Sequence, residues 1–282
     1  IKIEAVGNVF FDLNDADIRI DQVRAAEVAY TGDTLVHPEG GAEQAQVLLR
    51  AAVSAEAGDV RGAQLAFTSG DTTLCATEVK LWGSDRTGGM ASCTATLPVG
   101  NHPVTTTVDG RYTGSVTATV TVSPPTRLRF LGDGYLRSES TAGAYPLDPD
   151  HRIEFDLDGR ITYGERLVGK VLVGYRSGDQ RYKFQGNVLE SYGSYALGGG
   201  PATAQLRYQV TLFDLSTPQQ PVAVATGLTM RVSATLVSGP GQLDKIGITV
   251  WDGDTLMFSS SWTGTATEEI NLTASGGDLV LY

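Results

Sequence analysis

The stretch Thr117–Thr126 reads T-A-T-V-T-V-S-P-P-T, and it marks the end of one folded body and the start of another. Its first six residues alternate threonine with alanine or valine, which is the pattern of a half-buried β-strand. Pro124 and Pro125 follow directly. Neither can donate a ladder hydrogen bond, and together they hold the chain extended. We therefore predict a short, stiff connector at residues 124–126 between two β-rich units.

The residues before this connector form short apolar runs separated by turn residues. Asp109-Gly110 is a strong hairpin signal. About seven strands in about 100 residues is typical of an Ig-like sandwich. We assign this sandwich to residues 25–123.

The residues after the connector, 127–282, also read as strands. Ala204–Phe213 is a long alternating segment, and Asp244–Phe258 forms a hairpin that turns at Asp252-Gly-Asp254. The composition, with 34 Gly and 11 Pro, suits many turns rather than long helices. The predicted fold class is all-β: two consecutive β-sandwiches, preceded by an extended arm at residues 1–24.

The arm is too apolar for a solvated tail. Two arrangements are open. It adds edge strands to its own chain, or it pairs with the exposed sheet edge of another subunit. The residues that would carry this pairing are Ile1, Ile3, Ala5, Val9, Phe10 and Phe11.

The net charge and the first residue of the chain bear on the location of the protein and on its binding partners. A net charge of -11 argues against binding a phosphate backbone, and no apolar run is long enough to span a membrane. Ile1 stands where an initiator Met would be. Loss of a signal peptide predicts an extracellular or cell-surface location, although a trimmed chain would start the same way. In an exported β-domain, Cys75 and Cys93 predict a disulfide; two buried free thiols are the alternative.

Residues that could carry chemistry are sparse. His37, His102 and His151 are too dispersed to predict a metal site, and no nucleophile motif occurs. Catalytic residues and a resident cofactor are therefore not predicted.

The oxygen ligands of an acidic cluster would suit Ca²⁺, or the cluster forms two solvated turns. Its members are Asp148, Asp150, Asp156 and Asp158.

Tyrosines are dense in the second unit. An exposed row of them would stack on sugar rings, whereas half-buried strand positions are the alternative. The five are Tyr175, Tyr182, Tyr192, Tyr195 and Tyr208.

Several short motifs in the first unit resemble the bacterial Ig-like (Big) repeats of exported surface proteins. They are A-Y-T-G-D-T at 29–34, G-A-Q-L-A-F at 62–67, A-S-C-T at 91–94, L-P-V-G at 97–100 and V-D-G-R-Y at 108–112. This resemblance implies a spacer or adhesive module without catalysis, and it implies that Cys75 pairs with Cys93. Only one repeat is visible. Residues 134–282 resemble the post-COAP type of β-domain, from which no functional residues carry over.

The sequence thus favours a non-enzymatic structural protein of the bacterial cell surface, self-assembling into a fibre or surface layer by strand addition. A carbohydrate-binding or adhesive module is the alternative. A third hypothesis, a glycoside hydrolase fragment, needs paired carboxylates that no motif singles out.

Overall fold

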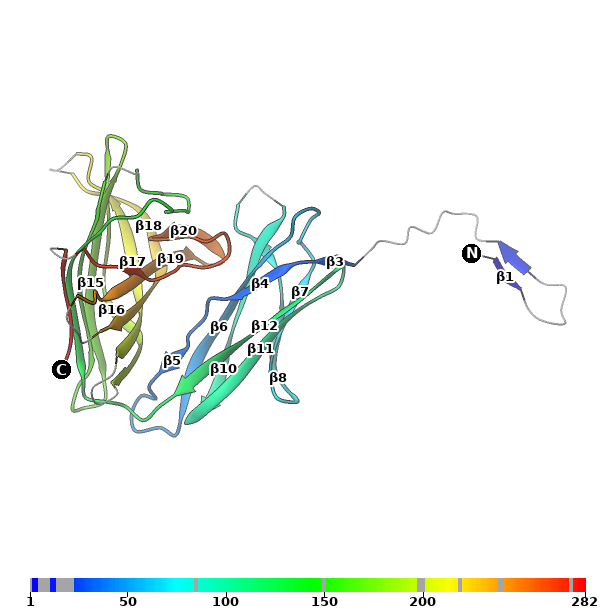
Figure 1. Ribbon diagram of the computed structural model, residues 1–282, viewed down its shortest axis with the longest axis horizontal. Helices are drawn as coiled ribbons and strands as arrows, with labels where there is room; N and C mark the ends of the chain where they lie inside the picture. The colour runs from blue at the N-terminus through cyan, green and yellow to red at the C-terminus, as the bar shows by residue number, and fades with distance from the viewer. Residues whose placement is uncertain are drawn as a thin grey trace.

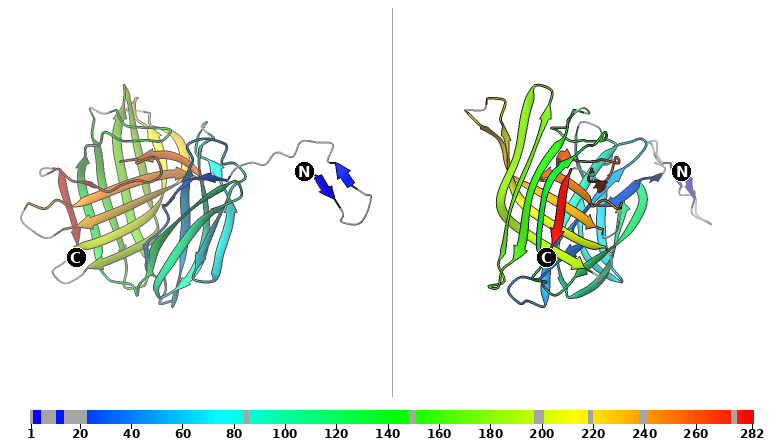
Figure 2. Two further views of the ribbon diagram at one scale, coloured as in Figure 1. Left: turned by 45° about the vertical axis from the view of Figure 1, so that its right-hand side comes forward. Right: turned by 60° about the vertical axis from the view of Figure 1, so that its left-hand side comes forward.

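The computed structural model describes the backbone of residues 2–4, 11–13, 23–83, 86–148, 151–196, 201–217, 220–237, 241–273 and 276–282. Every regular element in these ranges is a β-strand, which confirms the all-β class. Over the same ranges, nothing forms a helix with the length and apolarity needed for a membrane crossing. Figures 1 and 2 show two β-bodies lying side by side.

The first body is a sandwich of two sheets. One sheet has the order β4-β6-β10-β9, and the other has the order β3-β12-β11-β7-β8 with β5 also paired to β12. Its strands are β3 (Arg24–Ala25), β4 (Glu27–Tyr30), β5 (Leu35–Val36), β6 (Gln44–Ser54), β7 (Gln64–Ser69), β8 (Thr72–Glu78), β9 (Lys80–Leu81), β10 (Gly88–Pro98), β11 (Gly100–Asp109) and β12 (Tyr112–Val122).

The alternation in the sequence explains this sandwich. In β12 the threonines Thr113, Thr117 and Thr119 are exposed, whereas Val120 and Val122 are buried in the core between the sheets. The predicted hairpin at Asp109-Gly110 joins β11 to β12, and Gly110 takes the positive φ of 92° that the turn requires.

The predicted disulfide between Cys75 and Cys93 is present, with 6.7 Å between the Cα atoms. Cys75 lies on β8 and Cys93 on β10, which belong to different sheets. The bridge therefore ties the two layers together across the sandwich, rather than joining adjacent strands of one sheet.

The second body is built from a single antiparallel sheet with the order β20-β19-β18-β17-β16-β15-β14-β13-β22, and β21 pairs with β19. Its strands are β13 (Arg129–Leu136), β14 (Ile153–Ile161), β15 (Leu167–Ser177), β16 (Gln180–Ala196), β17 (Ala202–Asp214), β18 (Val222–Leu236), β19 (Lys245–Asp252), β20 (Thr255–Ser259), β21 (Ile270–Asn271) and β22 (Gly277–Leu281).

This sheet curls so that its inner face encloses a hydrophobic core (Figure 2). Register shifts interrupt the pairing of β16 with β17 and of β17 with β18. Bulges of this kind increase the local twist of a strand, so one sheet can supply both layers around the core. The predicted hairpin at Asp252-Gly-Asp254 is confirmed between β19 and β20.

The described strands of the arm are β1 (Lys2–Glu4) and β2 (Phe11–Leu13), which pair antiparallel with each other as a separate sheet. Ile1, Ala5, Val9 and Phe10 lie outside the described residues. Arg24, which we assigned to the arm, pairs instead with Tyr112 of β12. Pairing of the arm with a second subunit remains a prediction.

Candidate functional site

The two bodies meet at the segment that connects β4 to β5. Asp33 in this segment is only 1% exposed, and its carboxylate forms an ion pair with Arg207 of β17. The same carboxylate accepts the Leu48 N–H at 2.9 Å. A buried carboxylate held by both a cation and a backbone donor needs all of these partners, so it specifies how the bodies dock.

Backbone groups of the same segment bind the outer face of the second sheet. The Gln205 side-chain oxygen accepts the N–H groups of Thr34 at 2.7 Å and Leu35 at 3.2 Å. Arg231 donates to the Thr31 carbonyl at 3.0 Å. Arg50 of β6 donates to the Gly253 carbonyl at 3.1 Å.

Burial is the main influence on two of these guanidinium groups. It lowers the pKa of Arg50 to about 10, and Asp254 and Asp33 act in the opposite direction. It also lowers the pKa of Arg231, against the opposing effect of Asp33. Asp33 therefore offsets part of the cost of burying both cations at the interface.

The backbones of β5 and β16 approach each other beside this network. The His37 N–H donates to the Tyr192 carbonyl at 2.9 Å. A Cβ atom at Gly193 would collide with the carbonyl oxygen of Leu35. Only glycine allows so close a contact between two bodies, so Gly193 is part of the docking surface.

His37 lies buried at the same contact. Its Nε2 atom accepts the Ser194 N–H at 3.0 Å, and its Nδ1 atom lies 3.0 Å from the Ser123 carbonyl oxygen. An Nδ1–H tautomer satisfies both contacts, because Nε2 then remains free to accept. Burial lowers the pKa of His37, while hydrogen bonds to Ser123 and Ser194 act in the opposite direction.

This arrangement predicts a loss of stability in mild acid. Because the folded-state pKa lies below the ordinary value of 6.5, stability is full above pH 6.5 and falls as the pH drops toward the folded-state pKa. Urea unfolding at pH 7.5 and pH 5.5 measures the difference. The variant His37→Gln should show a smaller difference, and an equal loss in both proteins would contradict the assignment to His37.

An apolar cluster completes the interface. It joins Ala52 and Met90 of the first body to Trp251 and Leu256 of the second, with Trp82 and Trp262 packed against it. The ring centroids of Trp251 and Trp262 lie 6.1 Å apart. The chain has three tryptophans, and all three are in this cluster. Intrinsic tryptophan fluorescence therefore reports on docking of the bodies.

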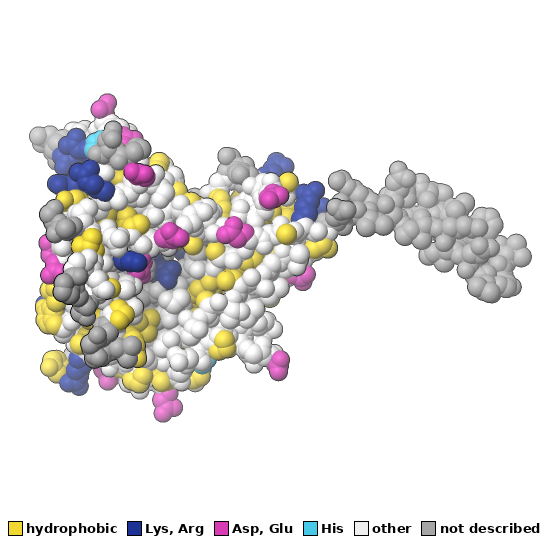
Figure 3. All heavy atoms as spheres, viewed as in Figure 1, with side chains coloured by type: hydrophobic (Ala, Val, Ile, Leu, Met, Phe, Trp, Pro, Cys, Tyr) yellow, Lys and Arg dark blue, Asp and Glu magenta, His cyan; other side chains and the backbone are white. Residues whose placement is uncertain are grey.

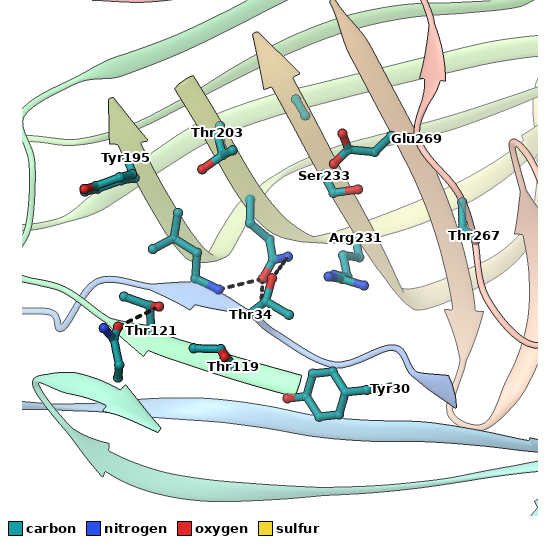
Figure 4. Close-up of a pocket in the computed structure, with 15 residues that line it drawn as sticks. Tyr30, Thr34, Thr119, Thr121, Tyr195, Thr203, Arg231, Ser233, Thr267 and Glu269 are labelled. Carbon is teal, nitrogen blue, oxygen red and sulfur yellow. Dashed lines mark hydrogen bonds between the residues drawn. The ribbon is translucent and has the colours of Figure 1, made fainter. Parts of the chain in front are cut away.

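A cleft of about 680 Å³ lies between the bodies, beside the polar network. Tyr30, Thr119 and Thr121 line it from the first body, and Tyr195, Thr203, Gln205, Arg231, Ser233 and Glu269 are among the residues that line it from the second. Figure 4 shows the two groups on opposite sides. Hydroxyl, amide and charged groups together give the cleft many hydrogen-bonding atoms, which suits a polar ligand or a polypeptide backbone.

Of the two alternatives for the five tyrosines, an exposed row or strand positions in the interior, the exposed row does not form. Four of the five are buried in the second body, because their strand positions face the inside of the curled sheet: Tyr175, Tyr182, Tyr192 and Tyr208. Tyr195 is the exception. It is 48% exposed and lies in the cleft.

The acidic cluster is divided among different partners. Asp156 pairs with Lys170, and Asp158 pairs with Arg129. Asp150 lies outside the described residues. Within the described ranges, no group of three or more acidic, histidine or cysteine side chains is arranged to hold a metal. On the face in Figure 3, acidic side chains are scattered over both bodies.

The three histidines occupy separate places, as their spacing suggested. His37 lies in the interface, His102 contacts the Pro98 carbonyl at 2.7 Å, and His151 lies near Asp148. Sequence reasoning did not identify the interface residues Asp33, Gln205 or Arg207. One signal was present in the sequence. Polar residues that alternate with apolar residues along a strand mark the face of the sheet that is turned away from the core. That signal does not tell which partner covers the face.

Comparison of the chain with protein-family models, with curated proteins and with solved structures gives no match.

Proposed function

We propose that this chain is a non-enzymatic, exported structural protein of the bacterial cell surface. We also propose that it assembles with copies of itself through its N-terminal arm. The observation that carries the proposal is the pairing of the arm. Its described strands, β1 and β2, form only a three-pair ladder with each other. A two-stranded hairpin is marginally stable in water, so the arm gains free energy by joining a larger sheet.

The clusters of the two bodies support the same role. Among the described residues, the apolar members of all three clusters lie at Ala26 or later in the chain. Among the described residues, each body therefore has its own hydrophobic core. The docking network adds a fixed geometry between the bodies, as a repeating structural unit requires. The disulfide and the resemblance to Ig-like surface repeats favour an exported location.

Sedimentation velocity tests the proposal. The full chain should form larger species as its concentration rises from about 1 to 100 μM, which spans common affinities for specific interfaces. A chain lacking residues 1–11 should stay monomeric with an unchanged melting temperature. Equal assembly by the truncated chain would exclude the arm as the assembly element.

Carbohydrate binding is a second candidate, and Tyr195 is the observation that favours it. Its half-exposed ring lies in a cleft rich in hydrogen-bonding groups, which is an arrangement suited to a sugar ring. Titration calorimetry with chito- and cello-oligosaccharides tests this function. Tyr195→Ala should abolish any binding, whereas Tyr163→Ala, which removes an 86% exposed ring outside the cleft, should not. Equal effects of the two variants would rule out the cleft.

A further inference from the structure

One edge of β12 is open in its middle. On one side, β11 pairs with β12 from Gly114 to Val122. On the other side, β3 pairs only at Tyr112 and Thr113, and β5 pairs only at Thr121 and Val122. The chain between β3 and β5 leaves this edge because β4 crosses to the other sheet and pairs with β6. Within the part of the chain that the structure describes, residues 114–120 therefore have a strand partner on one side only.

The direction of the hydrogen-bonding groups in this gap follows from a proline. Pro103 of β11 stands opposite Thr119, and proline has no N–H to donate. The two therefore form a non-hydrogen-bonded pair, in which the N–H and C=O of Thr119 point away from β11. Thr117 has the same orientation, since it lies two residues away. Thr121 agrees, because its outward N–H donates to the Thr34 carbonyl at 2.9 Å.

The gap has space beside it. Thr117 and Thr119 are exposed, and Thr119 lines the cleft between the bodies. In Figure 4, Thr119 and Thr121 lie across the cleft from Tyr195 and Thr203. A strand added to β12 here would meet polar side chains of the second body on its far side. Open backbone donors and acceptors beside such a space suit another polypeptide backbone in extended form.

The arm of the same chain starts in the wrong direction to fill this gap. β3 runs parallel to β12, with Arg24 beside Tyr112 at the start of β12. Val23, the described residue before β3, therefore lies at that end of β12, on the side away from residues 114–120. A strand from a second copy meets no such restriction.

We infer that the open edge of β12 between Gly114 and Val120 accepts an extended strand from the N-terminal arm of a second copy. This inference rests on the proposed assembly function and names its acceptor. One arm and one acceptor on each copy make a head-to-tail contact, which extends into filaments where it does not close.

Two complementary variants of the full chain test the acceptor and the donor. Thr119→Pro removes the outward N–H but no bond to β11, because the Thr119 N–H points away from that strand. Thr119→Val is the matched control, since it changes the side chain and keeps the backbone donor. Ile3→Pro with Glu4→Pro disables the arm: consecutive residues of a strand point their N–H groups to opposite sides, so one proline must remove a pairing donor.

Sedimentation velocity distinguishes the outcomes. We expect wild type and Thr119→Val to assemble, and each proline variant alone to remain monomeric, with at least about tenfold weaker association, equal to about 1.4 kcal/mol. An equimolar mixture of the two proline variants should form dimers and nothing longer. Each dimer would contain one intact arm, from Thr119→Pro, and one intact acceptor edge, from the arm variant. Formation of that dimer also shows that both variants are folded.

Other results overturn the inference in separable ways. If Thr119→Pro assembles as wild type does while the arm variant stays monomeric, the acceptor is wrong and the assembly function stands. If the wild-type protein itself stays monomeric, both the acceptor edge and the proposed assembly function are contradicted. If Thr119→Val loses assembly as fully as Thr119→Pro, side-chain recognition replaces strand addition. Should Thr119→Pro unfold by circular dichroism, Thr117→Pro provides the same test.

Discussion

Replacing Asp33 with alanine is expected to lower the free energy of unfolding by about 3–5 kcal/mol, the range for removing one partner of a buried ion pair. The carboxylate is almost fully buried, and the paired Arg207 side chain is only 14% exposed. Two further arginines, Arg50 and Arg231, interact electrostatically with Asp33. Without it, Arg207 retains its ion pair with Glu190 at 3.4 Å, but Arg50 and Arg231 lose a compensating charge. The Leu48 N–H also loses its acceptor.

Urea unfolding followed by both tryptophan fluorescence and circular dichroism measures this effect. The fluorescence midpoint should fall more, because the tryptophans report on the interface. Asp33→Asn keeps a hydrogen-bond acceptor for the Leu48 N–H, so its free energy of unfolding should fall less than that of Asp33→Ala. Asp156→Ala, which breaks an exposed pair with Lys170, should cost only about 0–1 kcal/mol. A loss of similar size for Asp33→Ala would show that the interface does not depend on this carboxylate.

Replacing Trp251 with alanine should also cost about 3–5 kcal/mol, the usual range for truncating a large buried ring. Trp251 is 1% exposed, and the Arg50 guanidinium carbon lies 5.2 Å from its ring centroid. Its loss leaves a cavity between the bodies and removes the cation–π contact. Since the damage lies at the interface, we expect unfolding to separate into two transitions by circular dichroism.

Phe184→Ala is the matched control for this prediction. Phe184 is fully buried within the core of the second body. Its truncation should cost a similar amount and should destabilise that body directly. If Trp251→Ala leaves unfolding as a single transition with an unchanged midpoint, the apolar cluster does not hold the bodies together.

The docked interface also controls the proposed acceptor. The cleft beside β12 has one wall on each body, so its shape depends on the contacts of Asp33 and Trp251. Variants that loosen docking should therefore weaken assembly without touching β12. This dependence links the stability of the interface to the function that we propose for the open edge.

The elements that the sequence determined are those with local causes. Alternation of threonine and valine defined β12, and glycine in turns defined the hairpins at Gly110 and Gly253. Each signal acts over a few residues, because strand geometry and turn conformation are set by neighbouring side chains. The all-β class was predictable from such patterns, and the pairing of Cys75 with Cys93 was predictable because one unit holds both cysteines of the chain.

Only the tertiary structure decided what covers each face and which edge stays open. Four tyrosines of the second body became core residues because bulges curl its sheet over their side of the strands: Tyr175, Tyr182, Tyr192 and Tyr208. Asp33 meets Arg207 across 174 positions of sequence, and no local pattern encodes that pairing. The open edge of β12 depends on β4 crossing to the opposite sheet, which is a property of topology. Alternation specifies that a strand has two faces, but long-range packing chooses the partner of each.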